Sequence, residues 1–221
     1  MLTKNDNQPM SEQAAKNPPG KKIKQERGRR TYDKLVATAF ELLEKEEYDT
    51  LTVDALSRAA GYSVGAFYAR FRSKDEFFDA LMAEYAEQRR RIRTNIFATT
   101  SADKLVDALI KELVTYYWQR RRFWREALIR SVRNPAFWDP VRSLSHEFSD
   151  LMIDHMARRS GRELTQKEIT NIQFATQVAL GTINNSIINR PGPVFIGQTR
   201  FIKNLARTFR LVSDYDRICS I

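Results

Sequence analysis

The side chains best suited to metal-dependent catalysis gather in one segment, "HEFSDLMIDH", residues 146–155. His146, Asp150 and Asp154 recur there every four residues, and imidazole and carboxylate groups are common ligands of zinc and similar divalent cations. On a helix, however, three residues over two turns span roughly 12 Å along the axis, too far for one ion without ligands from another helix. A polar helix face is therefore the preferred interpretation, and we expect no metal and no cofactor.

Few other residues in the chain could take part in catalysis. The chain has two histidines and one cysteine, Cys219, and it lacks a glycine-rich phosphate loop and a GxSxG nucleophile motif. We therefore expect that the protein is not an enzyme, with a metal-dependent enzyme built on the His146 face as the alternative. A single cysteine excludes an intramolecular disulfide, and no apolar run indicates a secretory signal or a membrane span, so a cytoplasmic location is expected.

A second kind of chemistry, the binding of a polyanion, is indicated by the distribution of charge. The chain carries 37 basic and 27 acidic residues, which gives a net charge of +10. No acidic residue occurs between Ala55 and Lys74, whereas Arg58, Arg70 and Arg72 do. Such an excess favours nucleic acid or an anionic membrane surface as the partner. A membrane-surface protein would need a basic amphipathic helix, so it is kept as an alternative and no membrane partner is expected.

The elements that would position these cations are two short helices marked by their capping residues. Thr52 is a favourable N-cap for a helix over residues 53–60, and Gly61 can end that helix in the left-handed conformation. Ser63 can cap a third helix that reaches about Phe71. Two short helices joined by a tight glycine-containing turn form a helix-turn-helix, whose second helix enters the major groove of DNA.

A longer helix is predicted on each side of this motif. Apolar residues at helical spacing predict a first helix from Thr31 to about Glu46. Ser73 and Glu76 have the spacing of a capping box, which predicts a fourth helix that runs to about Arg93.

The residues around the turn have chemical reasons to contact DNA. Gly65 and Ala66 have no large side chains, so this side of the third helix can approach the duplex closely. Tyr68 can donate its hydroxyl to a phosphate. Lys74, with the free N–H groups at the start of the fourth helix, can bind an anion, and Thr52 can hold a second phosphate.

The segment "LTVDALSRAAGYSVGAFYARFRSKDEFFDAL" resembles the DNA-binding head of the tetracycline-repressor-like (TetR) transcriptional regulators. The match runs from Thr52 to Phe77 in the order T-V-x-x-[I/L]-[A/S]-x-x-A-G-[V/Y]-S-x-G-[A/T]-[F/L]-Y-x-x-F-x-[S/N]-K-[D/E]-[E/A]-[F/L]. The whole run, preceded by an amphipathic helix, is specific, and the resemblance covers roughly residues 28–85. Beyond it, only the all-helical layout and the length are similar.

This resemblance implies a homodimeric transcriptional regulator, most often a repressor, that binds a double-stranded DNA operator. It implies that the last two long helices pair with those of the partner subunit, and that a small molecule in the body changes the separation of the heads and releases DNA. Backbone contacts then fall on Thr52, Tyr68 and Lys74, and groove contacts within residues 62–69. The complete set of predicted DNA-binding residues is Arg29, Arg30, Thr52, Tyr62, Ser63, Val64, Gly65, Ala66, Tyr68, Ala69, Arg70 and Lys74.

Two positions depart from the commoner pattern of the family. Val64 stands where a polar or basic residue is frequent, and Ala69 stands where a larger side chain is frequent. Neither can form a bidentate hydrogen bond with a base, but apolar side chains can read the thymine methyl group. We therefore hypothesise that Val64, Ala66 and Ala69 favour thymine-containing steps, while Tyr62 and Ser63 supply polar contacts.

Composition divides the chain into four predicted parts. The first is polar and ends in a cluster of cations, so it is expected to be disordered. Arg29 and Arg30 at its end either enter the adjacent minor groove or add only nonspecific attraction. The parts are a disordered basic arm, 1–29; a helix-turn-helix DNA-binding domain, 30–73; a linking helix, 74–93; and a ligand-binding and dimerisation domain, 94–221.

The expected fold is all-α, with an N-terminal three-helix helix-turn-helix head and a larger helical ligand-binding and dimerisation body. Aromatic residues are frequent in the body, where they fill the core or line an apolar pocket between helices. We expect a small-molecule effector that is largely apolar. Six residues are candidates to bind it, and the polar ones are equally candidates for a polar dimer seam: Tyr117, Trp124, Phe148, Gln173, Thr176 and Gln177.

Two basic runs in and near the body stay open to more than one interpretation. Residues 120–125 combine four arginines with Phe123 and Trp124. Solvated arginines beside a buried Trp124 are preferred there over a second nucleic-acid patch or a contact with an anionic effector. Residues 89–93, "RRRIR", either add positive potential toward DNA or are simply solvated.

Overall fold

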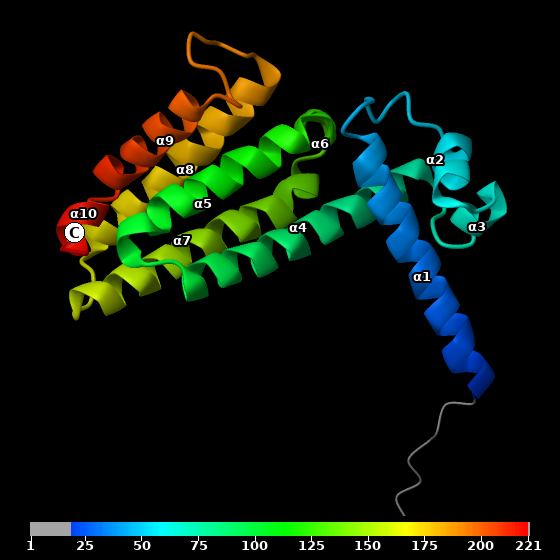
Figure 1. Ribbon diagram of the computed structural model, residues 1–221, viewed down its shortest axis with the longest axis horizontal. Helices are drawn as coiled ribbons and strands as arrows, with labels where there is room; N and C mark the ends of the chain where they lie inside the picture. Colours follow the sequence, from blue (N-terminus) through cyan, green and yellow to red (C-terminus); the bar gives the residue numbers. More distant parts are fainter. Residues whose placement is uncertain (1–18, 221) are drawn as a thin grey trace, which may run out of the picture.

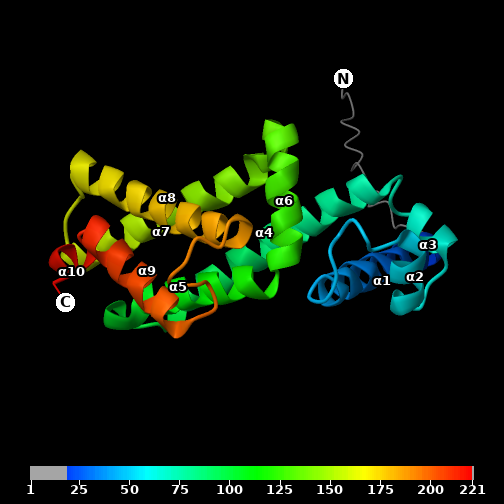
Figure 2. The same ribbon diagram turned by 90° about the horizontal axis from the view of Figure 1, so that it is seen from above.

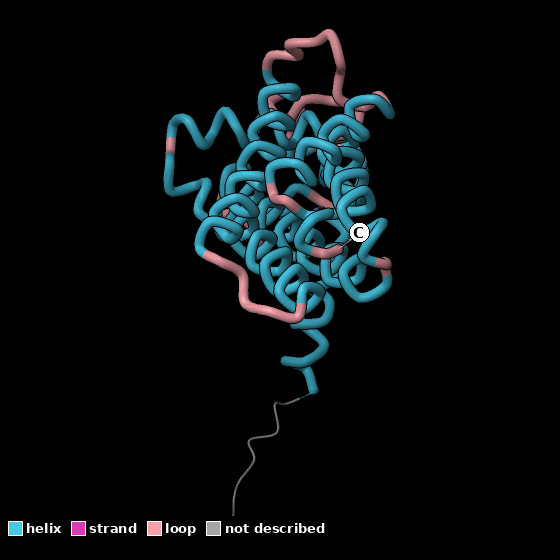
Figure 3. The backbone as a smooth tube through the Cα atoms, turned by 90° about the vertical axis from the view of Figure 1, so that its left-hand side faces the viewer, coloured by secondary structure: helices cyan, strands magenta, loops and turns pink. Residues whose placement is uncertain are grey.

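The computed structural model describes residues 19–220, and this part of the chain consists of helices and loops without a strand (Figure 3). A small head lies at one end and a larger body at the other, joined by one long helix (Figures 1 and 2). The predicted all-α fold, with a helix-turn-helix head before a helical body, is confirmed. Among the described residues, no helix is both long enough and apolar enough to span a membrane.

The head comprises α1 (Pro19–Leu42), α2 (Val53–Ala60) and α3 (Val64–Tyr68), and α4 (Lys74–Thr99) runs from it into the body. The body contains α5 (Ala102–Gln119), α6 (Arg121–Arg133), the short 3-10 helix η1 (Pro135–Trp138), α7 (Asp139–Ser160), α8 (Gln166–Ile188), α9 (Thr199–Val212) and α10 (Tyr215–Ile218). Helix α9 packs against α5 and α8, and α7 packs against α8 and α4.

Helix α1 begins earlier than the sequence analysis predicted. Residues 19–29 are helical, so the prediction of a disordered arm is wrong for them, and residues 1–18 of that predicted arm lie outside the described residues. Pro19 suits the first position of a helix, and the lysines, arginines, Gln and Glu that follow are good helix formers. Gly28 is buried, and a Cβ added to it would lie 2.6 Å from Arg70 Nη2. This turn of α1 therefore packs closely against the Arg70 side chain, which follows α3.

The helix-turn-helix is defined locally by its capping residues, as predicted. The Thr52 hydroxyl accepts a 3.0 Å hydrogen bond from Ala55 N at the start of α2, and the Ser63 hydroxyl accepts a 3.2 Å bond from Ala66 N at the start of α3. Gly61 ends α2 with φ of 78°, in the left-handed region that glycine adopts without strain. The turn between α2 and α3 therefore follows from two side chains and one glycine conformation.

The cap of α4 differs in one detail from the predicted capping box. The Ser73 hydroxyl accepts a 3.1 Å bond from Glu76 N, which is the expected half of the motif. The Glu76 carboxylate instead accepts a 2.6 Å bond from the backbone N–H of Arg72, one residue before the cap. Both contacts satisfy backbone N–H groups at the helix entry, and α4 then continues to Thr99 rather than stopping near Arg93.

The head rests on α6 of the body through aromatic rings and ion pairs. Phe123 lies with its ring centroid 5.3 Å from that of Phe40 and 5.1 Å from that of Phe78. Beside this contact, Glu47 of the head receives Arg122 Nε at 3.3 Å and Arg125 Nη1 at 3.1 Å. The arginines of the 120–125 run are therefore partly engaged with the head, while Trp124 is buried as expected.

Candidate nucleic-acid interface

The outer surface of α3 is formed by small residues and one large aromatic side chain. Gly65 and Ala69 are exposed, and Tyr68 between them is 54% exposed. A Cβ added to Gly65 would lie no closer than 3.7 Å to any neighbouring atom, the Ser63 hydroxyl oxygen, so this face is open on the protein side. Because the side chains on this surface are mostly small, a duplex can approach the backbone of α3 closely.

The inner surface of α3 is held by a cluster of aromatic rings. Phe67 is fully buried, with its ring centroid 5.2 Å from that of Phe71 and 5.3 Å from that of Phe77. Edge-to-face and tilted packing of this kind adds to the free energy of burial. A helix of five residues cannot be stable by itself, so this cluster determines where the exposed face of α3 points.

Three further predicted groove residues are only partly exposed. Tyr62, Val64 and Ala66 are half-buried, whereas Ser63 is exposed at the cap of α3. The structure therefore brings the predicted residues 62–69 together on one short helix and the turn that precedes it, with Ala69 the most accessible of the three apolar residues assigned to thymine.

Thr52 and Lys74 lie close together, among the side chains packed between α2 and the start of α4. The Thr52 hydroxyl is already an acceptor in the α2 cap, but its own proton is still able to donate to a phosphate oxygen. Two of the three residues assigned to phosphate contacts thus lie close together, at the start of α2 and of α4.

Lys74 also has a structural contact that the sequence analysis did not foresee. Its Nζ donates to the carbonyl oxygens of Tyr48 at 2.6 Å and Asp49 at 3.2 Å, and the Tyr48 hydroxyl donates back to the Lys74 carbonyl. Burial lowers the pKa of the Lys74 ammonium from its ordinary value. Because an ammonium has three donors, one N–H bond is left for a phosphate while the other two fix the loop before α2.

The basic residues around α3 are exposed and only weakly paired. Arg30 and Arg70 are exposed, and Arg29 makes a long 3.9 Å contact with Asp33 one turn away on α1. Exposed ion pairs of this kind contribute little, so these cations keep most of their positive potential. The predicted minor-groove residues Arg29 and Arg30 therefore project from a helix rather than from a flexible arm.

The six residues predicted to bind an effector line two adjoining cavities in the body. The smaller cavity has a volume of about 40 Å³ and is lined in part by Phe148 and Thr176, and the larger has about 740 Å³ and is lined in part by Trp124, Gln173 and Gln177. Tyr117 lines both cavities. The Trp124 indole donates a 2.8 Å hydrogen bond to Asn184 Oδ1, which fixes one wall of the larger cavity.

The polar face of residues 146–154 does not form a metal centre. His146 and Asp150 line the larger cavity, whereas Asp154 is not among its lining residues. Within residues 19–220, no group of three or more His, Cys, Asp or Glu side chains is arranged to hold a metal ion. The structure therefore does not bring His146, Asp150 and Asp154 together as one ligand set.

Two functional candidates in the body were missed by the sequence analysis. Arg89 and Arg93 are neither solvated nor directed toward DNA, because they are buried with 4% and 5% of their surface exposed. They follow Phe78, Met82 and Tyr85 on the same face of α4, at intervals of three or four residues. That apolar stripe, continued into two arginines, is the signal that would have predicted their burial.

The sequence of the head matches a known family of regulators. Residues 35–81 match the family model described as bacterial regulatory proteins, tetR family. A curated relative, the uncharacterized HTH-type transcriptional regulator YwcC from Bacillus subtilis (strain 168), is 47% identical over 47 residues. The match covers 21% of each chain, so this likeness is confined to the head.

The whole fold matches solved regulators at low sequence identity. A TetR transcription regulator from Haloarcula marismortui ATCC 43049 aligns with a TM-score of 0.65 and 16% identity, over 83% of this chain and 96% of that one. A tetR-family transcriptional regulator from Streptomyces coelicolor aligns with a TM-score of 0.64 and 14% identity, over 87% of this chain and 82% of that one. The predicted resemblance is thus confirmed for the head by sequence and for the rest of the chain by fold.

Proposed function

We propose that this chain, which is TetR-like in the sequence of its head and in its overall fold, is a homodimeric transcriptional repressor that a small molecule releases from its DNA operator. The observation that carries this proposal is α3, a short capped helix with an exposed Gly65–Tyr68–Ala69 face and no acidic residue in the surrounding segment. In this proposal the protein acts in the cytoplasm, where it would meet its DNA operator.

In this proposal, α3 lies in the major groove and α2 crosses the phosphate backbone. Thr52, Tyr68 and Lys74 bind phosphates, and these contacts position the head without reading sequence. Val64 and Ala69, with Ala66, contact thymine methyl groups. The remaining assigned residues supply polar and electrostatic contacts at the edge of the interface: Tyr62, Ser63, Gly65, Arg70, Arg29 and Arg30.

The same proposal gives each part of the chain a function. Residues 30–73 form the DNA-binding domain, residues 74–93 form the linking helix, and residues 94–221 form the ligand-binding and dimerisation domain. Helix α4 begins at the first of these boundaries, continues across the second, and carries side chains that line the smaller cavity. A ligand in the body can therefore act on the head through a single rigid element.

The test of DNA binding is a selection of random duplexes on the purified chain near physiological salt, followed by sequencing. We expect a two-fold-symmetric motif, with half-sites separated by one or more helical turns and with thymine under α3. A motif without thymine there would refute the assignment of the apolar contacts. Recovery of no motif by protein that is free of co-purified ligand would refute the regulator itself.

A matched pair of variants separates loss of docking from loss of folding. Gly65→Leu should keep the melting temperature, because its Cβ meets no close neighbour, but the added side chain would block the approach of DNA. Thr115→Leu adds the same side chain at an exposed position on α5 and should leave DNA binding unchanged. Equal DNA binding by the two variants would show that α3 does not face the duplex.

An unpartnered face of α8 and α9 supports the proposed dimer. Phe174 and Ile188 on α8 are 54% and 44% exposed, and Leu211 on α9 is 67% exposed. Phe174, Gly181 and Ile188 are spaced by seven residues, which places them on one side of α8. Apolar groups gathered on one side of two neighbouring helices are typical of a surface that a partner subunit covers.

Substitution of Gly181 tests this dimer. Gly181 is exposed, and a Cβ added to it would have no atom of its own chain within 4 Å. Gly181→Arg should therefore fold normally, with some gain in helix propensity, yet place a charged side chain in the seam and yield monomers. Light scattering after gel filtration measures the mass, and Val132→Arg, at an exposed apolar site on α6, should stay dimeric. A dimeric Gly181→Arg protein would place the interface elsewhere.

A further inference from the structure

Arg93 is a buried cation whose hydrogen-bonding capacity is incompletely used. Its Nη1 donates to the Leu144 carbonyl at 2.7 Å, its Nη2 lies 3.4 Å from Glu147 Oε2, and its Nε has no partner within the described residues. Burial lowers the pKa of this guanidinium. A charged donor kept out of water without a partner is costly, so a partner that is not part of the chain would stabilise it.

The charges around Arg93 leave a local positive surplus. Glu147 gives both of its carboxylate oxygens to Arg90, each at 2.8 Å, so its contact with Arg93 is secondary. Glu112 pairs with Arg89. Among the described residues joined by these hydrogen bonds, three guanidinium groups thus face two carboxylates. Glu87 adds only a long 3.9 Å contact with Arg90, so Arg93 is the least compensated of the three.

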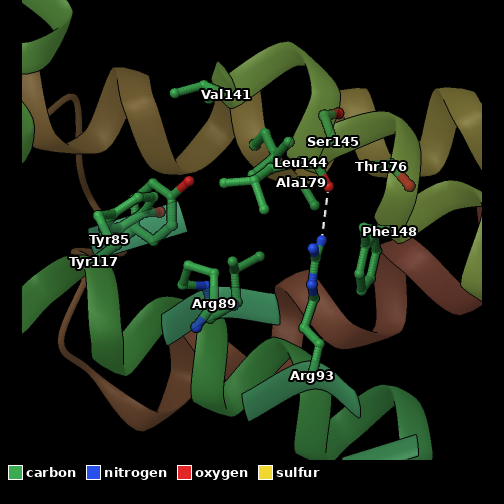
Figure 4. A pocket seen from close by; sticks show the side chains of 12 residues that line it. Tyr85, Arg89, Arg93, Tyr117, Val141, Leu144, Ser145, Phe148, Thr176 and Ala179 are labelled. Carbon is green, nitrogen blue, oxygen red and sulfur yellow. Dashed lines mark hydrogen bonds between the residues drawn. The ribbon is translucent and has the colours of Figure 1, made fainter. Parts of the chain in front are cut away.

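The smaller cavity opens directly onto these arginines. Figure 4 shows Arg93 between Phe148 and Leu144, with Arg89 beside it and the rings of Tyr85 and Tyr117 across the cavity. Its lining contains two cations and no carboxylate. Burial raises the pKa of both tyrosine hydroxyls, so they stay protonated, and the Tyr117 hydroxyl is able to donate to an anion.

The size of this cavity suits the polar end of a ligand rather than a whole one. A volume of about 40 Å³ accommodates about three water molecules by this measure, or a carboxylate group in their place. The larger cavity of about 740 Å³ adjoins it, since both are lined by the same four residues: Tyr117, Val141, Ser145 and Leu180. Trp124 and Trp138 add aromatic surface to the larger cavity, where an apolar group would find contacts.

We propose that the Arg89–Arg93 cavity binds the carboxylate of a small organic acid whose apolar body lies in the adjoining larger cavity. The proposal rests on the function proposed above in one respect, because it identifies this acid as the effector. It refines the expectation of a largely apolar effector by giving that molecule a charged end.

The position of Arg93 also explains how such an acid would act. Arg93 is on α4, and its present partners, Leu144 and Glu147, are on α7. A carboxylate in the cavity competes with both for the guanidinium and so loosens the contact between the linking helix and α7. The Leu144 carbonyl lies inside α7, where the helix ladder supplies it with another donor, so the exchange leaves no unpaired backbone group.

The test is isothermal titration of the full chain, without DNA, with octanoate and 3-phenylpropanoate and with their uncharged amides. We expect at least one acid to bind roughly tenfold to a hundredfold more tightly than its amide, as a charge-assisted hydrogen bond predicts. Arg93→Met should abolish this preference. Arg91→Met, on the same helix but with an exposed side chain, should retain it.

Each other outcome contradicts the inference. Equal affinity for acid and amide, no saturable binding of either acid, or an undiminished preference in Arg93→Met would overturn it. If circular dichroism shows that Arg93→Met does not fold, Arg93→Lys, which keeps the charge but loses the planar fork, should show a reduced preference. A chain that selects an operator but shows no preference for acids would refute this inference alone. A chain that prefers acids but selects no operator would refute the proposed function alone.

Discussion

Phe67→Ala is expected to lower the free energy of unfolding by about 3–5 kcal/mol, the usual cost of removing a fully buried phenylalanine. Phe67 is fully buried and packs against Phe71 and Phe77. A loss of this size is comparable with the whole stability of many domains, about 5–15 kcal/mol, so the head should unfold early and DNA binding should be lost. Denaturant unfolding followed by circular dichroism measures the change.

The adjacent residue provides the control. Tyr68 is 54% exposed, and Tyr68→Ala should change the free energy of unfolding by only about 0.5 kcal/mol while it weakens binding to every DNA sequence. The two variants thus separate the inner and outer faces of α3. If Phe67→Ala were as stable as the unmodified protein, the aromatic cluster would not be what positions this helix.

Glu168→Gln is expected to lower the stability of the body by about 2 kcal/mol, or the melting temperature by roughly 4–8 °C. Glu168 accepts hydrogen bonds from Arg162 at 2.9 and 2.7 Å, from the Thr165 backbone N–H at 2.9 Å, and from Arg217 at 3.2 Å. It therefore joins the loop before α8, the cap of α8 and the C-terminal turn. Calorimetry at neutral pH measures the loss.

The same carboxylate predicts how stability depends on pH. The hydrogen bonds from Arg162, with those from Thr165, hold the pKa of Glu168 well below its ordinary value. A group whose pKa is lowered by folding stabilises the native state above its unfolded pKa of about 4.3, and this contribution is lost as the pH falls below that value.

The difference in melting temperature between the unmodified protein and Glu168→Gln should therefore be full at pH 7 and shrink below about pH 4. Glu163→Gln, an exposed neighbour on the same loop, should show no such difference. A gap that stayed constant down to strongly acidic pH would mean that the charge of Glu168 is not what stabilises the loop.

Much of the head could be predicted because its signals are local. Thr52, Ser63 and Ser73 cap their helices through hydrogen bonds to residues three positions ahead, and Gly61 ends α2 by its own backbone preference. Such contacts depend only on near neighbours in sequence. The early start of α1 was missed because composition alone favoured disorder, whereas helix propensity and packing at Gly28 favour helix.

The features that could not be predicted depend on distant parts of the chain. Glu47 and the α6 arginines are more than 70 residues apart, and no local pattern indicates that they meet. Arg93 was interpreted as exposed because arginine usually is, although its position on the buried face of α4 argued otherwise. The partners of Arg93, Leu144 and Glu147, become evident only when α7 is placed against α4.

The continuity of α4 has a thermodynamic consequence. Lys74, assigned to DNA, and Arg93, assigned to the acid, lie on one uninterrupted helix, about 28 Å apart along its axis. If the acid lowers the affinity for the operator by a given factor, the operator must lower the affinity for the acid by the same factor. Protein bound to DNA would then sense the acid less readily than free protein does, so the concentration that triggers release depends on the affinity of each operator.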